Sequence, residues 1–168
     1  MVKTLLKILV PVIFLTGAAS CAKKNCSGPC ASNQECYEGA CVCTDGTEGT
    51  NCLTYSYEKY ERSYYVSEAC APPEPYGSAN VFIQHNPNNI SQLLIYNLFY
   101  GSCSYIIAVI HTNGSNLGDI LEIPSQNANC AGNTVSGVGS YDEANHRITL
   151  QLDFVANGTD YQCTETLY

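Results

Sequence analysis

Eleven cysteines are the residues of this 168-residue chain with the clearest chemistry, and their number is odd. They stand at positions 21, 26, 30, 36, 41, 43, 52, 70, 103, 130 and 163. In an exported protein such cysteines pair as disulfides, whereas in a reducing compartment they serve as metal ligands or nucleophiles. An odd count means that at least one cysteine has a fate other than a bridge within the chain.

The N-terminus indicates export. Lys3 and Lys7 precede an apolar run over residues 8–15, and small residues lead from there to Cys21. This order is typical of an export signal with a cleavage site, and the run is too short to span a bilayer, which takes about 20 apolar residues. We therefore assign residues 1–20 to a signal and leave them out of the fold.

The end of this signal resembles the lipobox of bacterial lipoproteins. Ala19, Ser20 and Cys21 fit that motif, although Ala18 stands where its strict form has Leu. The resemblance implies acyl chains on Cys21, with residues 21–25 as a tether, and two or more acyl chains anchor a protein stably. It predicts an exported lipoprotein at the outer membrane or cell surface, with ten cysteines left to pair. The alternative is ordinary cleavage that leaves Cys21 free or paired.

The charge of the chain argues against several partners. Seven Lys and Arg against fifteen Asp and Glu give a net charge of −8. Such an acidic chain lacks the basic surface that binds nucleic acid or anionic lipid headgroups. We expect no nucleic-acid partner.

Six cysteines crowd into residues 26–52, and their spacing resembles that of an EGF-like module. The signature of that family ends in Cys-x-Cys, a Gly and a last Cys, which Cys41, Cys43, Gly49 and Cys52 match. Six cysteines alone allow 15 pairings. The resemblance implies one set, namely Cys26–Cys36, Cys30–Cys41 and Cys43–Cys52.

Neither calcium nor zinc is expected in this module. The residues before its first cysteine, 22–25, include Lys23 and Lys24, whose charges repel a divalent cation. A zinc site is disfavoured because no histidine lies within residues 21–84 and the compartment is oxidising. We predict no metal and no cofactor, and a module that acts as a spacer.

Residues 53–62 read as a linker or a short helical turn. Tyr57, Tyr60 and Tyr64 recur there at helical spacing. Tyrosines in this arrangement either cap the next domain or form a strip that stacks on carbohydrate.

Residues 63–168 predict an all-β domain, an antiparallel up-and-down eight-stranded barrel or sandwich. Short β-rich runs alternate with turn residues, among them Asn113-Gly114 and Asn157-Gly158, and Asn-Gly is the strongest hairpin signal. The expected strands are 63–70, 79–85, 90–99, 103–111, 118–123, 134–141, 147–156 and 159–167.

The faces of these strands differ. Residues 147–156 alternate between apolar and polar side chains, so one face is buried. The third and fourth strands, 90–99 and 103–111, are apolar on both faces, so other parts of the protein or a partner must cover each face. The cover is either the linker tyrosines or the EGF-like module, or else an exposed patch binds a partner.

The four remaining cysteines fall at one end of the meander. Disulfides need Cα atoms within roughly 7 Å, and Cys70–Cys163 with Cys103–Cys130 meets that limit more easily than other pairings. This end lies opposite the module and carries the longest loops, where binding residues usually lie. The candidates for binding there are Tyr76, Tyr100 and Gln126.

The succession of lipobox, EGF-like module and small β domain resembles lipoproteins of the Bacteroidota kind, whose last domain is similar to lipocalin-like folds. Where a lipocalin has Gly-x-Trp, this chain has Ser63-Tyr64-Tyr65, and it has no tryptophan. We predict a binding or structural protein with a protein or glycan partner. The alternatives are a carrier of a small apolar ligand and a secreted EGF-type factor.

No enzyme is predicted. The chain has no Gly-x-Ser-x-Gly and no His-x-x-x-His, and its cysteines are assigned to bridges or lipid. His85, His111 and His146 fall at predicted strand ends, far apart in sequence, which favours exposed turn residues over a metal site.

Overall fold

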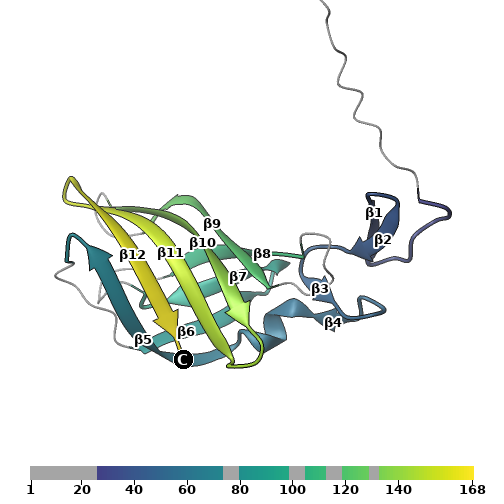
Figure 1. Cartoon of the computed structure of the whole chain (residues 1–168), viewed down its shortest axis with the longest axis horizontal. Coiled ribbons are helices and arrows are strands. Elements are labelled where there is room, and N and C mark those ends of the chain that lie inside the picture. Colours follow the sequence, from purple (N-terminus) through teal and green to yellow (C-terminus); the bar gives the residue numbers. More distant parts are fainter. Residues whose placement is uncertain (1–25, 74–79, 99–104, 113–118, 129–132) are drawn as a thin grey trace, which may run out of the picture.

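The computed structural model describes two parts, a small N-terminal module and a closed β-barrel (Figure 1). It describes residues 26–73, 80–98, 105–112, 119–128 and 133–168. The predicted class, an all-β chain with a disulfide-rich module and an eight-stranded antiparallel domain, is confirmed, and the domain is a barrel. No helix in these ranges is long and apolar enough to cross a membrane.

The module consists of two short antiparallel pairs. β1 (Gln34–Tyr37) pairs with β2 (Ala40–Cys43), and β3 (Thr47–Glu48) pairs with β4 (Thr54–Tyr55). The β1–β2 turn is Glu38-Gly39, with φ of 50° and 90°. Two positive φ values match the right-handed twist of the flanking strands.

Three disulfides hold this module together. They join Cys26 to Cys36, Cys30 to Cys41 and Cys43 to Cys52, with Cα–Cα distances of 5.2–5.7 Å. These are the pairs that the EGF-like spacing implies. Val42 is its one buried branched aliphatic side chain among the described residues, so the bridges replace a core that the module is too small to form.

A single 3₁₀ turn, η1 (Ser56–Lys59), connects the module to the barrel. Directly after it Tyr60 is fully buried, and the Tyr64 hydroxyl donates to the Tyr60 carbonyl at 2.9 Å. Both rings belong to the barrel core. The linker tyrosines therefore pack into the end of the barrel, as expected if they cap the next domain, and not on the outside of the third and fourth strands.

The barrel is an up-and-down meander in which each strand pairs with its neighbours in sequence and β12 closes onto β5. Every boundary lies within a few residues of the predicted one. The strands are β5 (Arg62–Ala71), β6 (Asn80–Asn86), β7 (Asn89–Tyr96), β8 (Ile106–His111), β9 (Ile120–Asn127), β10 (Thr134–Asp142), β11 (Arg147–Ala156) and β12 (Thr159–Leu167).

The barrel interior follows from strict alternation. On β11 the side chains of Ile148, Leu150, Leu152 and Phe154 are at most 2% exposed, as the sequence pattern predicts. Inward side chains of all eight strands join one apolar cluster. Packing is tight at Gly139, where an added Cβ would lie 2.4 Å from a terminal methyl group of Leu150.

The closing pair carries the fourth described bridge, Cys70–Cys163. These residues face each other directly in the β5–β12 register, with Cα atoms 4.0 Å apart. Cys70 lies near the end of β5, whereas β5 begins next to η1 and the module. The predicted partners Cys103 and Cys130 lie outside the described residues.

Candidate functional site

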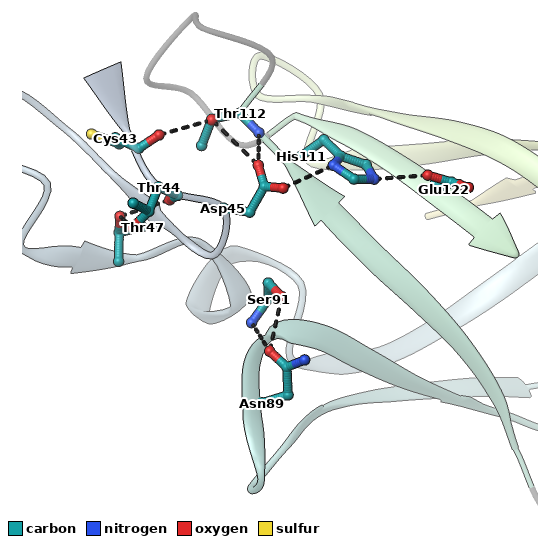
Figure 2. A network of polar contacts seen from close by, with 9 residues as sticks. All are labelled: Cys43, Thr44, Asp45, Thr47, Asn89, Ser91, His111, Thr112 and Glu122. Carbon is teal, nitrogen blue, oxygen red and sulfur yellow. Dashed lines mark hydrogen bonds and ion pairs between the residues drawn. The ribbon is translucent and has the colours of Figure 1, made fainter. Parts of the chain in front are cut away.

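The contact surface between the module and the barrel carries a network of polar contacts (Figure 2). It joins the loop after β2 to the end of β8, about 65 residues further along the chain. Thr112 is 3% exposed; its hydroxyl donates to the Cys43 carbonyl and its backbone N–H to Asp45 Oδ1, both at 3.0 Å. A buried threonine thus satisfies its polar groups with the module.

His111 extends the same network across the barrel wall. Its Nδ1 lies 3.0 Å from Asp45 Oδ2, and its Nε2 lies 2.9 Å from Glu122 Oε2 on β9. Figure 2 shows the ring between the two carboxylates. The ring therefore connects Asp45 of the module with Glu122 of the barrel wall.

Shape complements these polar contacts at Gly46. Its φ is +88°, and an added Cβ would lie 2.8 Å from the Ile90 carbonyl oxygen and the Ser91 nitrogen. The opposing β6–β7 hairpin is shaped by Asn89, whose Oδ1 accepts from the Ser91 N–H at 3.1 Å and hydroxyl at 2.8 Å. Only glycine permits this approach of two backbones.

Lys59 forms a second link between the two parts. Its Nζ lies 2.7 Å from Glu48 Oε2 of the module and 2.6 Å from Asp119 Oδ1 beside β9, and its side chain is 12% exposed. Burial alone would lower the pKa of Lys59, but hydrogen bonds with Asp119 and Glu48 outweigh it and raise that pKa. The lysine therefore stays charged and holds both carboxylates.

Two further contacts hold the segment that connects the module to the barrel, residues 56–61, against β6. Tyr57 stacks on His85 with ring centroids 4.3 Å apart, and the His85 ring also contacts the Glu61 carboxylate. Burial raises the pKa of Tyr60 far above its ordinary value. The module end of the barrel is thus closed by a neutral, buried phenol, and His85 contacts both Tyr57 and Glu61 beside it.

The predicted site residues fall in different places. Tyr76 and Tyr100 lie outside the described residues, as does the proposed lipidation site, Cys21. Gln126 is described, and its side-chain amide forms hydrogen bonds with the backbone of Ile107 on β8, where a neighbouring strand would otherwise pair. It accepts from the Ile107 N–H at 2.8 Å and donates to the Ile107 carbonyl at 2.7 Å. Pro124 has no N–H to pair there, and β9 bulges against β10.

The three histidines make contacts within the barrel, with the module or with the segment that connects the two. Like His85 and His111, His146 contacts a neighbouring side chain: its Nδ1 lies 3.0 Å from the hydroxyl oxygen of Tyr141. In the described part, the two clusters that bring three potential metal ligands within 4.8 Å contain disulfide-bonded cysteines. A bridged sulfur is not the thiolate that metals bind.

Sequence reasoning missed the docking residues Asp45, Gly46 and Thr112, and also Glu165. Glu165 is fully buried in the barrel, directly across from Glu68 on β5. Its inward position follows from the alternation of β12, with Cys163 and Leu167 on the same face. The chain matches no known family model, no curated protein and no solved structure.

Proposed function

We propose that this chain is a lipid-anchored extracytoplasmic binding or structural protein. In this view Cys21 carries the anchor, the EGF-like module is a spacer, and the barrel is presented to a protein or glycan partner. The observation that carries the proposal is the docking of the module on the barrel through Asp45, Gly46 and Thr112. A spacer that is fixed in this way transmits an orientation from the anchor to the barrel.

Two further observations support the proposal. Four described disulfides fit an exported protein in an oxidising compartment. The inward side chains of the eight strands pack into one apolar cluster, and Tyr60 and Tyr64 close one end. Among the described residues, the outward side chains of these strands, such as Gln151 and Asp153 of β11, are the ones that a partner can meet.

The anchor is tested by the intact mass of the protein purified from its own membranes, with and without reduction. We expect the mass of two or three acyl chains on the chain that begins at Cys21, and a gain of about 10 Da on reduction from five disulfides. A Cys21→Ser variant is the control and loses the acyl mass. An unlipidated wild-type mass with one free or mixed-disulfide thiol would exclude the anchor and favour a secreted EGF-type factor.

A further inference from the structure

The outer wall of the barrel has a hollow of about 680 Å³ over β10, β11, β12 and β5. It lies on the face opposite to the core, because the polar residues of β11 that line it, Gln151 and Asp153, alternate with the buried Leu150, Leu152 and Phe154. Figure 1 shows these four strands side by side on one flank of the barrel. The hollow is therefore accessible from solvent and separate from the packed interior.

The strand register explains its shape. Gln151 lies beside Thr164, which lies beside Ala69; one row further, Asp153 lies beside Gln162, which lies beside Ala71. Neighbouring strands are about 4.8 Å apart, so each row spans roughly 10 Å. The alanines of β5 leave space where longer side chains would stand, and the polar groups of β11 and β12 border that space.

The polar groups of this hollow are free to meet a ligand. Within the described part of the chain, the side chains of Gln151, Asp153, Gln162 and Thr164 make no hydrogen bond to another protein group. Together they offer two amides and a hydroxyl, which donate and accept, and a carboxylate, which accepts. Groups of this kind match the vicinal hydroxyls of a sugar, each of which is a donor and an acceptor at once.

The charge of the lining selects among ligands. Asp153 is its one charged residue, and no lysine or arginine lines the described hollow. An anionic ligand such as a phosphate or a sulfated glycan would meet a carboxylate without a compensating cation. A neutral polyhydroxylated ligand meets donors and acceptors without this penalty.

A second hollow of about 580 Å³ continues the first along β9 and shares Gly137 and Val138 with it. Its lining includes Ile120, Pro124 and the paired side chains of His111 and Glu122, and Ile120 and Val138 are 40% and 53% exposed. Exposed aliphatic groups beside a polar row suit a ligand with a C–H face and a hydroxyl edge. The two hollows form one groove, since Gly137 and Val138 line both.

We propose that this outer groove binds a neutral oligosaccharide, with Asp153, Gln151 and Gln162 on its hydroxyls and Val138 against its C–H face. The inference rests on the proposed binding function and assigns it to the barrel wall instead of the loops at the barrel end. The intact mass of the protein tests the lipid anchor and not the groove. A failure of the anchor proposal is therefore distinguishable from a failure of the groove proposal.

The test is calorimetric titration of the whole protein with four probes: cellohexaose, maltohexaose, mannohexaose and xylohexaose. The protein is kept in a zwitterionic detergent, because glucoside or maltoside headgroups would compete. We expect at least one probe to bind. The double variant Asp153→Ala, Gln162→Ala should bind it about tenfold more weakly, since two hydrogen bonds to the ligand are lost. Ala71→Trp, which fills the hollow, should abolish binding.

Asp160→Ala is the matched control, because Asp160 is an exposed acidic residue of β12 outside the groove. It should bind the probe as the wild type does. Near-ultraviolet circular dichroism confirms that each variant is folded. The proposal is overturned if none of the four probes binds, or if both groove variants bind as the wild type does. It is equally overturned if a hexalysine peptide binds through Asp153 and no sugar does, since the groove would then be a surface for basic peptides.

Discussion

The module and the barrel reach a defined structure by different means. The module has three bridges within residues 26–52, and its buried apolar side chains in the described structure are Val42, Cys43 and Cys52. The barrel has one described bridge, Cys70–Cys163, and a continuous apolar core from eight strands. Covalent cross-links replace burial where a chain is too short to form a core.

The comparison also shows where the two parts depend on each other. The polar groups of Thr112 on the barrel are satisfied by Cys43 and Asp45 of the module. Lys59 in the connection holds one carboxylate from each side. The difference between the parts teaches that the module folds by its bridges but takes its orientation from the barrel.

The largest expected effect is in the barrel core. Phe154→Ala removes a ring that is 2% exposed and should lower the free energy of unfolding of the barrel by about 3 to 5 kcal/mol. Phe82→Ala is the matched control, because that ring is 42% exposed on the outer face, and it should cost roughly 1 kcal/mol or less. Urea unfolding followed by tyrosine fluorescence measures both. Equal losses would contradict the described core.

The next effect is confined to the module. Replacing both Cys43 and Cys52 by alanine opens a bridge over nine positions, which contributes about 2 to 3 kcal/mol. Since the module has little core to compensate, its amides should exchange within seconds in hydrogen–deuterium exchange, while β11 and β12 stay protected. The loss should be largest at β3 and β4, because Cys26–Cys36 and Cys30–Cys41 still hold β1 and β2. Persistent protection of β3 and β4 would show that this part of the module is held by something other than the Cys43–Cys52 bridge.

A smaller effect is expected at the contact between the two parts. Gly46→Ala adds a Cβ against the backbone of Ile90 at a φ of +88°, and strain of this kind costs on the order of 1 to 3 kcal/mol. The module should undock while both parts stay folded, which would appear as faster exchange at Thr112. Gly28→Ala, which meets nothing within 4 Å, should change nothing. Undiminished protection of Thr112 in Gly46→Ala would argue against the docked arrangement.

The smallest effect depends on pH. The folded pKa values of Lys59 and Tyr60 lie above their ordinary values of 10.5 and 10.0. Groups whose pKa is raised on folding contribute stability below the unfolded pKa and lose it as pH rises. The urea concentration at the unfolding midpoint should therefore decrease as the pH rises from 9 to 11. It should decrease by less in Tyr60→Phe. A midpoint that is constant over this range would contradict the burial of Tyr60 and the ion pairs of Lys59.

Much of the barrel could be predicted because its signals are local. Alternation over residues 147–156 and the Asn157-Gly158 turn define the β11–β12 hairpin without any distant contact. For the module, six cysteines alone allow 15 pairings, and it is the resemblance to the EGF-like family that implies the set found in the structure. By contrast the spacing of Tyr57, Tyr60 and Tyr64 left two readings open, a cap on the next domain or a carbohydrate-stacking strip, and only the closed barrel shows that Tyr60 is part of the core.

The docking site could not be predicted, because its partners are far apart in sequence. Asp45 and Thr112 are 67 positions apart, and neither stands in a motif. Gln126 did carry a signal: Pro124 within a strand requires another group to complete the pairing. That signal indicates a structural amide, whereas its position in a long loop had suggested binding.

The fixed orientation of the module on the barrel is measured most directly by residual dipolar couplings of a soluble Cys21→Ser protein. Backbone N–H couplings from residues 26–52 and from the eight barrel strands are fitted separately. The account predicts one alignment tensor for both parts, lost in Gly46→Ala. Two different tensors in the parent protein would mean that module and barrel tumble independently, and the module would then be a flexible tether instead of a spacer that presents the barrel.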